Sequence, residues 1–234
     1  MDLKDCIALI TGGGTGIGLE TARLLKQGGA KVAVCGRRPD VLEAAAKEVG
    51  ALAVAGDVGR EEDAARMVET VVGELGGYNT LINNAGWGRF GMLMDLELSE
   101  MRAIFETNVF GAMLMARESA RHFVKAGRGG NIVNISSTAG GRGFPGGTAY
   151  VASKFALGGM TECWRAELRK HDIRVMQVNP SEVQTEFASA AGRQQKLSER
   201  KLRSEDIAHA IVSMLSMHDR GFTTELTVFA TNPD

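Results

Sequence analysis

Two side chains that could move a proton lie four residues apart late in the sequence. Tyr150 opens the segment YVASK and Lys154 closes it. Positions i and i+4 of a helix share one face, so the Lys154 ammonium could lie beside the Tyr150 phenol. A neighbouring cation favours the phenolate and lowers a phenol pKa that starts near ~10. We therefore expect Tyr150 to act as a general acid or base near neutral pH, although a half-buried tyrosine and a surface lysine would give the same spacing.

A glycine-rich turn near the start of the chain is typical of a phosphate-binding loop. Residues Thr11–Gly18 read TGGGTGIG, directly after the apolar run CIALI and directly before a helical pattern. Gly12 can form the tight turn, while Gly16 and Gly18 let the backbone approach a pyrophosphate and the sheet. The N-terminus of the following helix then binds the phosphates; a flexible loop without a ligand is the alternative. The turn residues expected to contact a dinucleotide are Gly12, Gly14, Thr15, Gly16, Ile17 and Gly18.

The segment CGRRPD, which follows the next apolar run, bears on the choice between NAD and NADP. Chains that bind NAD commonly place a carboxylate here for the ribose 2′-OH, and an arginine accommodates a 2′-phosphate. Gly36 occupies the expected acidic position, and Arg37 and Arg38 follow it. A guanidinium pairs with phosphate in a bidentate fashion, so the segment favours NADP. Asp40 is close enough to keep NAD as the alternative.

Short apolar runs that alternate with helical patterns would position these groups. The runs are rich in Val and Ile and do not alternate in polarity, which is typical of parallel strands buried on both faces. This rhythm predicts an α/β fold, a Rossmann-type doubly wound parallel sheet of about seven strands with helices on both faces. The expected strands are Cys6–Ile10, Lys31–Cys35, Leu52–Ala55, Thr80–Asn83, Asn131–Ile135, Ile173–Val178 and Glu225–Phe229. The expected helices include Ile17–Lys26, Val41–Val49, Glu62–Glu74, Glu100–Lys125 and Tyr150–Lys170.

Length and composition set the limits of this interpretation. The chain has 234 residues, 44% of them hydrophobic and 24% charged, which excludes a disordered or collagen-like chain. We expect one domain over residues 1–234, in which the polar segment 186–203 is mobile and covers the substrate. The 27 basic and 28 acidic residues leave no cationic excess, so nucleic acid is not an expected partner.

Cysteine and histidine usage argues against a metal or disulfide framework. The three cysteines are far apart without a CxxC pair, and the four histidines lack metal-ligand spacing, so no metal site is expected. Reduced thiols fit a cytoplasmic protein. The apolar run in the opening MDLKDCIALI is too short for the hydrophobic region of a signal peptide, and no apolar run approaches a membrane span, so no membrane association is expected.

Taken together, the motifs resemble the short-chain dehydrogenases/reductases. TGGGTGIG, NNAG (Asn83–Gly86), Asn108, Ser137 and YVASK occur in that family's order, from about Ile7 to Thr185. The resemblance implies that the catalytic residues are Asn108, Ser137, Tyr150 and Lys154. In reduction, Tyr150 would give a proton to the carbonyl oxygen and Ser137 would hydrogen-bond that oxygen. Lys154 would tune Tyr150 and hold the nicotinamide ribose, and Asn108 would position a water that relays protons. Ser136 is the competing hydroxyl, but the thirteen-residue interval to Tyr150 favours Ser137.

The resemblance also implies a set of contacts to the cofactor. Asp57 and Val58 would meet the adenine, and Asn84, Ala85 and Gly86 would line the ribose side. Val183 and Thr185 would contact the nicotinamide carboxamide, in a loop that begins at Pro180. Two departures stand out: Ser181 replaces the family's common glycine after that proline, and Thr15 replaces a basic residue of many NADP enzymes.

The expected function is an oxidoreductase that transfers a hydride between NADP(H) and a ketone or aldehyde. The closest groups in character reduce 3-oxoacyl chains on acyl carrier protein or act as broad carbonyl reductases, so a small-molecule carbonyl or an acyl thioester is the expected substrate. Arg128, Lys170 and His171 would meet an acidic carrier, with the alternative that they are cations favoured by the dipole at helix C-termini. Phe187 would form an apolar wall. The family also implies a homodimer or homotetramer that pairs the helices around Glu100–Lys125 and Tyr150–Lys170. A catalytically silent nucleotide-binding or sensor protein on the same fold is the alternative.

Overall fold

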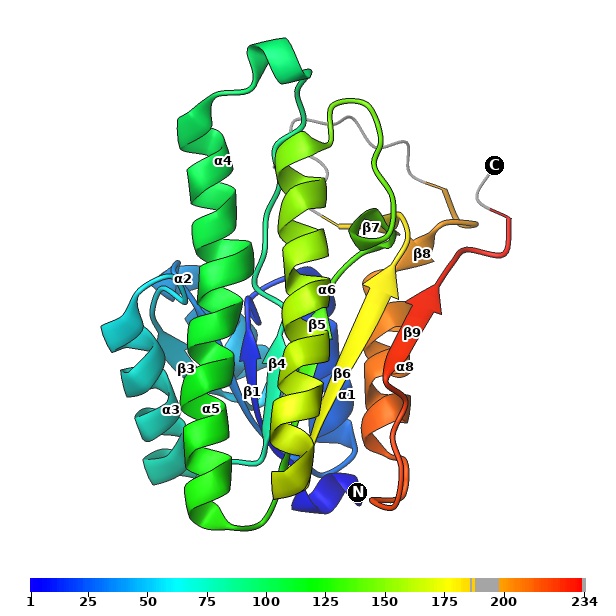
Figure 1. The fold of residues 1–234 in the computed structure, drawn as a ribbon. Coiled ribbons are helices and arrows are strands. Elements are labelled where there is room, and N and C mark those ends of the chain that lie inside the picture. The colour runs from blue at the N-terminus through cyan, green and yellow to red at the C-terminus, as the bar shows by residue number, and fades with distance from the viewer. Residues whose placement is uncertain (186, 188–197, 233–234) are drawn as a thin grey trace.

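The computed structural model describes residues 1–185, 187 and 198–232. Its centre is a seven-stranded sheet, all parallel, in the order β3-β2-β1-β4-β5-β6-β9 (Figure 1). The predicted doubly wound fold is confirmed, and each expected strand is present with small shifts at its ends. The strands are β1 (Ile7–Thr11), β2 (Lys31–Gly36), β3 (Leu52–Ala55), β4 (Thr80–Asn83), β5 (Gly130–Ile135), β6 (Ile173–Pro180) and β9 (Glu225–Val228).

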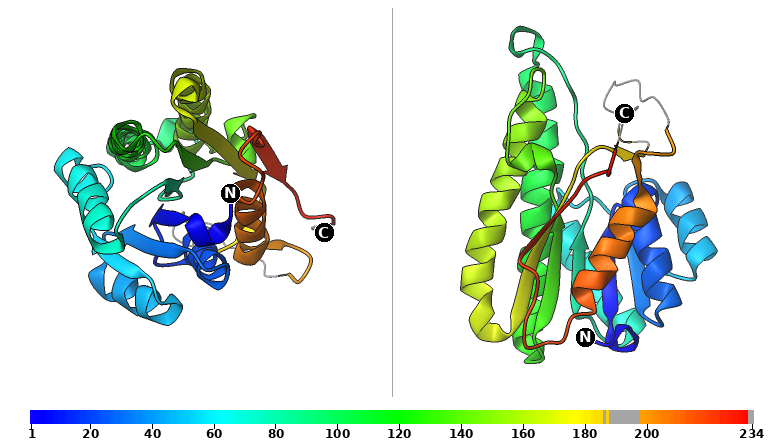
Figure 2. Two further views of the ribbon diagram at one scale, coloured as in Figure 1. Left: turned by 90° about the horizontal axis from the view of Figure 1, so that it is seen from below. Right: turned by 90° about the vertical axis from the view of Figure 1, so that its right-hand side faces the viewer.

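Helices cover both faces of the sheet and produce two apolar cores (Figure 2). One core joins the sheet to α1 (Gly16–Gln27), α2 (Pro39–Val49) and α8 (Ser204–Leu215). The other joins it to α3 (Glu61–Leu75), α5 (Ala112–Ala126) and α6 (Thr148–Leu168). All eight residues of β6 are buried, as the non-alternating apolar runs predicted for strands covered on both sides.

The strand order reverses direction between β1 and β4, and this reversal locates the site. The connection after β1 leads to one side of the sheet and the connection after β4 to the other, which opens a crevice at the carboxyl ends of these strands. The glycine-rich turn follows β1 and NNAG spans the end of β4, so both motifs lie at this crevice.

The expected helix over Glu100–Lys125 is not one regular α-helix. It consists of α4 (Leu98–Phe105), a π-helical turn (Glu106–Gly111) and α5. A π turn is rare and appears frequently at functional sites. Asn108 lies within this turn, so the local departure from α-helical geometry positions one of the four catalytic residues that the family resemblance implies.

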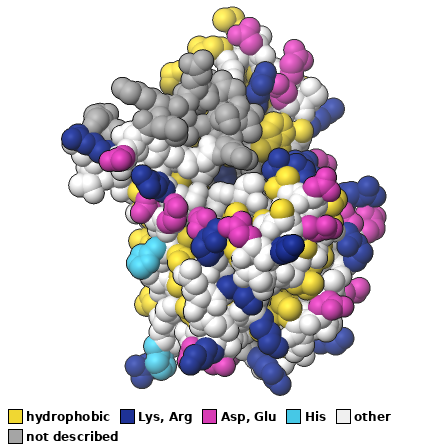
Figure 3. Space-filling model, turned by 180° about the vertical axis from the view of Figure 1, so that it is seen from behind, with side chains coloured by type: hydrophobic (Ala, Val, Ile, Leu, Met, Phe, Trp, Pro, Cys, Tyr) yellow, Lys and Arg dark blue, Asp and Glu magenta, His cyan; other side chains and the backbone are white. Residues whose placement is uncertain are grey.

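Short elements complete the described chain. Two-residue strands β7 (Val183–Gln184) and β8 (Leu202–Arg203) pair beside α8. The 3-10 turns are η1 (Leu3–Asp5), η2 (Leu93–Asp95), η4 (Thr138–Gly140) and η5 (Arg169–His171). Among the described residues, no helix is long and apolar enough to cross a membrane. Basic and acidic side chains are interspersed on the rear surface (Figure 3), as the balanced composition predicts.

Candidate active site

A cavity of about 850 Å³ lies at the carboxyl ends of the strands. The structure places almost every site residue expected from the sequence on its wall, from the glycine turn through the end of β2 to α6. The exceptions are Gly18, which packs beneath the turn, and Asn108, which lies behind the wall. The expected residues that line the cavity are Gly12, Gly14, Thr15, Gly16, Ile17, Arg37, Arg38, Asp57, Val58, Asn84, Ala85, Gly86, Ser137, Tyr150, Lys154, Pro180, Val183 and Thr185.

The glycine turn has the geometry that a dinucleotide requires. Gly12 and Gly16 have φ values of 63° and 55°, in the left-handed region that favours glycine. A Cβ atom at Gly18 would lie 2.5 Å from the Gly12 carbonyl oxygen and 2.6 Å from Asn84 Nδ2. Thr15 precedes α1, and its side chain makes no capping hydrogen bond within the described chain. The backbone N–H groups that begin α1 therefore suit an anionic pyrophosphate.

Sequence reasoning assigned no role to Gly13, although the structure requires a glycine there. A Cβ atom at this position would lie 2.6 Å from Val34 Cβ on the neighbouring strand. The run of three glycines was the available signal, but no periodic pattern indicates which of them faces β2.

Arg37 and Arg38 lie where the end of β2 meets the cavity. Arg37 is exposed and its Nη1 is 4.0 Å from Asp57 Oδ2. The Asp57 Oδ1 atom accepts a hydrogen bond from the Gly59 backbone N–H at 3.0 Å. A Cβ atom at Gly36 would meet only Leu42 Cδ1, at 3.7 Å, so this position has room for a side chain. This end of the cavity therefore carries Arg37 and Arg38 beside the Asp57 carboxylate, and Gly36 stands at the position where NAD-binding chains commonly have a carboxylate.

Tyr150 and Lys154 lie on one face of α6, as the spacing predicted. Lys154 Nζ is 5.7 Å from the centre of the Tyr150 ring and donates a 2.8 Å hydrogen bond to the Ile135 carbonyl. Lys154 is only 5% exposed. Both residues therefore belong to the same buried corner of the cavity, where β5 ends.

The expected lowering of the Tyr150 pKa is wrong for this structure. Burial raises the pKa of Tyr150 to about 12, and a hydrogen bond with the Ser137 hydroxyl opposes that rise. Burial also lowers the pKa of Lys154 to about 8. The loss of hydration disfavours the charged form of each group, and it is the largest cause of both pKa shifts.

Of the two candidate hydroxyls, Ser137 is the one whose side chain lowers the pKa of Tyr150. Its Oγ also accepts a hydrogen bond from the Ala139 backbone N–H at 3.1 Å, where it caps the short turn η4. Ser136 Oγ is buried and has no hydrogen-bond partner among the described residues. Ser137 therefore stays the expected partner of Tyr150.

Asn108 does not line the cavity but contacts residues that do or that lie next to it. Its side chain exchanges two hydrogen bonds with the Trp87 backbone and donates a third to Ser153 Oγ at 3.0 Å. A Cβ atom at Gly86 would lie 3.2 Å from Asn108 Oδ1 and 3.6 Å from Lys154 Nζ. The Asn108 and Lys154 side chains thus meet around Gly86, at the end of NNAG.

Several cavity residues escaped sequence reasoning. Trp87, Phe90, Arg142 and Phe144 all line the cavity. They lie in the loops that follow β4 and β5, where no periodic pattern indicates a facing direction. Phe187, which was expected to form an apolar wall, does line the cavity; Glu186 and residues 188–197 of the expected covering segment lie outside the described residues.

The residues expected to meet an acidic carrier lie at the other end of the molecule. Arg128 precedes the start of β5, and Lys170 and His171 belong to η5, just before β6. They therefore lie at the amino ends of these strands, whereas the cavity lies at the carboxyl ends (Figure 1). Within one chain, the structure does not bring these residues to the cavity.

Comparison with known proteins identifies the family. The model of the short chain dehydrogenase family matches residues 6–196. The chain belongs to the short-chain dehydrogenase family. It is therefore an oxidoreductase of the dehydrogenase/reductase type, and the predicted family resemblance is confirmed.

Individual members of the short-chain dehydrogenase family match along most of the chain. The human 3-oxoacyl-[acyl-carrier-protein] reductase is 32% identical, over 90% of this chain and 91% of its own length. The structure of a 3-ketoacyl-(acyl-carrier-protein) reductase from Brucella melitensis complexed with NADH superposes with a TM-score of 0.88. It is 31% identical and covers 97% of this chain and 98% of its own. A serine dehydrogenase complexed with NADP+ superposes with a TM-score of 0.87 at 26% identity, over 94% of this chain and 93% of its own.

One relative in the short-chain dehydrogenase family is much longer. An uncharacterized oxidoreductase of Bacillus subtilis, YxnA, is 36% identical over 192 residues. These residues are 79% of this chain but only 54% of the relative, so this chain spans about half of it.

Proposed function

We propose that the protein is an NADP(H)-dependent reductase of ketones or aldehydes, which oxidises secondary alcohols in reverse. The observation that carries this proposal is the position of Ser137, Tyr150 and Lys154 together on one wall of a cavity whose other end contains the glycine turn. The cofactor supplies the hydride, and the protein supplies orientation and a proton.

Each of the four residues Asn108, Ser137, Tyr150 and Lys154 has a role that fits its contacts. Tyr150 gives its phenolic proton to the carbonyl oxygen, and its high pKa keeps that proton in place at neutral pH. Ser137, whose side chain lowers the pKa of Tyr150, orients the same oxygen. Lys154 holds the nicotinamide ribose from its buried position beside the Tyr150 ring. Asn108 belongs to a path that carries protons from Lys154 to solvent, and both side chains lie close to Gly86.

The preference for NADP rests on the end of β2. Arg37 and Arg38 supply two guanidinium groups at the cavity, and Gly36 leaves out the carboxylate that would repel a 2′-phosphate. The relatives described above include one complex with NADH and one with NADP+, so the family accepts both cofactors. The arginine pair of this chain supports NADP.

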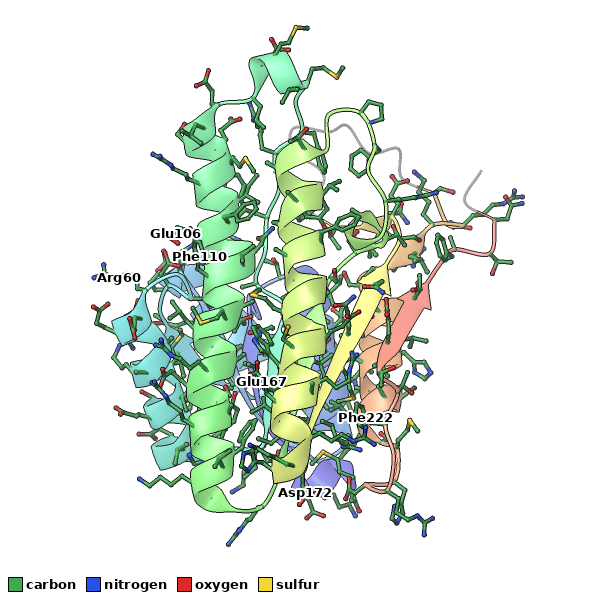
Figure 4. All side chains as sticks on the ribbon, in the orientation of Figure 1. Arg60, Glu106, Phe110, Glu167, Asp172 and Phe222 are labelled. Carbon is green, nitrogen blue, oxygen red and sulfur yellow. The ribbon has the colours of Figure 1, made fainter. Side chains whose placement is uncertain are left out.

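The relatives that reduce 3-oxoacyl groups support an acyl thioester as one substrate. We also expect a homodimer or homotetramer built on the outer faces of α5 and α6. Phe110, in the π turn before α5 and labelled in Figure 4, is 47% exposed. Phe155 of α6 is 48% exposed.

Oxidation of NADPH in the presence of a panel of ketones, aldehydes, sugars and 3-oxoacyl thioesters tests the proposal. Tyr150→Phe should lower kcat by ~100-fold or more, because a positioned acid contributes ~10²–10⁴ in rate, while the Kd for NADPH changes little. Tyr78→Phe is the matched control, since Tyr78 is the other tyrosine and lies in the core. Binding of NADPH without oxidation by any carbonyl would instead favour a silent nucleotide-binding or sensor protein.

A further inference from the structure

Four aromatic rings form a row along the substrate end of the cavity. The Phe187 ring centre lies 5.3 Å from that of Tyr150, which lies 5.7 Å from that of Phe90. Phe144 continues the row, 5.9 Å from Phe90. These separations are those of interacting aromatic pairs. All four residues line the cavity.

The rings come from separate segments that meet only in the folded chain. Phe90 lies in the loop after β4, Phe144 in the loop between β5 and α6, and Phe187 after β7. The backbone of the first loop lies against the row, because a Cβ atom at Gly88 would be 3.0 Å from Tyr150 Cδ2 and 3.1 Å from Phe187 Cζ. The aromatic wall therefore surrounds the proposed proton donor rather than a remote part of the cavity.

The position of Tyr150 in this row determines what a substrate meets. A carbonyl oxygen that takes the Tyr150 proton must come within hydrogen-bond distance of the phenol. The groups attached to that carbonyl then lie against the rings next to Tyr150, either Phe90 with Phe144 beyond it or Phe187. Ring faces and edges favour other rings over saturated chains of similar size.

We infer that the substrate is a carbonyl compound with an aromatic or similarly flat apolar substituent, which packs against Phe90 and Phe144 while Tyr150 holds the carbonyl oxygen. This inference rests on the proposed function and narrows it, because it distinguishes an aryl-substituted ketone from a linear 3-oxoacyl chain. Phe90 and Phe144 are then residues that determine specificity.

Three ketones with unconjugated carbonyl groups test the inference in the NADPH-bound protein. Phenylacetone and cyclohexylacetone differ in the flatness of the ring, and 2-octanone represents a linear chain. We expect kcat/KM for phenylacetone to exceed the other two by about tenfold, a difference of ~1.4 kcal/mol. Phe144→Leu and Phe90→Leu each retain apolar volume and should reduce this ratio at least threefold.

Phe222→Leu is the matched control. Figure 4 shows Phe222 low beside α8, away from the cavity, and it packs partly buried against the core. This variant should keep the wild-type ratio. Equal kcat/KM values for the three ketones, or an unchanged ratio in both cavity variants, would overturn the inference.

Binding provides a second measurement that does not depend on turnover. Trp87 lines the cavity, and Trp164→Phe removes the other tryptophan, so Trp87 fluorescence can report ketone binding to the NADPH complex. Phenylacetone should bind about tenfold more tightly than cyclohexylacetone. Equal affinities for the two ketones would refute the aromatic preference. Tighter binding of phenylacetone without any oxidation of NADPH would refute the proposed reaction but not the aromatic binding site.

Discussion

The Asn108 side chain closes a pair of hydrogen bonds with the backbone of Trp87. Asn108 Nδ2 donates to the Trp87 carbonyl at 2.9 Å, and the Trp87 N–H donates to Asn108 Oδ1 at 3.0 Å. The third bond, from Nδ2 to Ser153 Oγ, connects the π turn to α6. One amide thus holds together the loop after β4, the π turn and the helix that carries Tyr150. We therefore expect Asn108 to act as a positioning residue in addition to any role in the proton path.

Two substitutions of Asn108 should distinguish the contributions of these three hydrogen bonds. Asn108→Asp retains the acceptor for Trp87 N–H but loses both Nδ2 bonds, and Asn108→Ala loses all three. Because the side chain is 1% exposed, each buried group left unpaired should cost about 1–3 kcal/mol in the free energy of unfolding. The pH profile of kcat/KM should also change, since a purely structural role would lower the melting temperature without moving the profile.

The control for Asn108 is a residue of the same turn. Glu106→Gln lies on the exposed outer side of the π turn, where Figure 4 shows the side chain, and should leave both measurements unchanged. Wild-type stability and an unaltered pH profile in Asn108→Ala would contradict the positioning role.

Cofactor preference should respond to a carboxylate at the end of β2. Gly36→Asp fits sterically, because the nearest atom to its Cβ would be Leu42 Cδ1 at 3.7 Å. The new carboxylate should repel a 2′-phosphate and accept a hydrogen bond from the ribose 2′-OH. The ratio of kcat/KM for NADPH over NADH should therefore fall at least tenfold. Gly36→Asn, equal in size and neutral, is the control for charge. Equal effects of both variants would show that the size of the side chain, and not its charge, determines the cofactor preference.

The sequence predicted the sheet, the glycine turn and the clustering of Ser137, Tyr150 and Lys154, because each depends on local pattern and on the rule that parallel strands share a carboxyl edge. It did not predict the π turn at Asn108, since the apolar periodicity of 100–125 runs through it without a break. The sequence also did not predict the raised pKa of Tyr150. Burial of that phenol depends on Phe90 and Phe187, which distant loops bring to α6.

Two glycines of the TGGGTGIG turn should differ sharply in tolerance to alanine. A Cβ at Gly18 would lie 2.5 Å from the Gly12 carbonyl oxygen, whereas one at Gly14 would make an ordinary contact, 3.5 Å from Val41 Cγ1. Gly18→Ala must move the turn, so NADPH should bind at least tenfold more weakly and the melting temperature should fall. Gly14→Ala should keep the wild-type melting temperature. Calorimetry and NADPH titration measure both effects, and equal behaviour of the two variants would refute this account of the turn.

Lys154 should make the stability of the cofactor-free protein depend on pH. Burial lowers the pKa of Lys154 from 10.5 to about 8, so between these values the unfolded chain binds a proton that the folded chain has released. The free energy of unfolding must therefore rise with pH across this window. Lys154→Met lacks the titrating group and should remove this pH dependence.

The free energy of unfolding of the wild type, relative to that of Lys154→Met, should increase by about 3 kcal/mol from about pH 7 to about pH 10.5, which is the equivalent of the pKa difference. Chemical denaturation of both proteins at several pH values measures this increase, and a constant difference would mean that Lys154 keeps its ordinary pKa when folded.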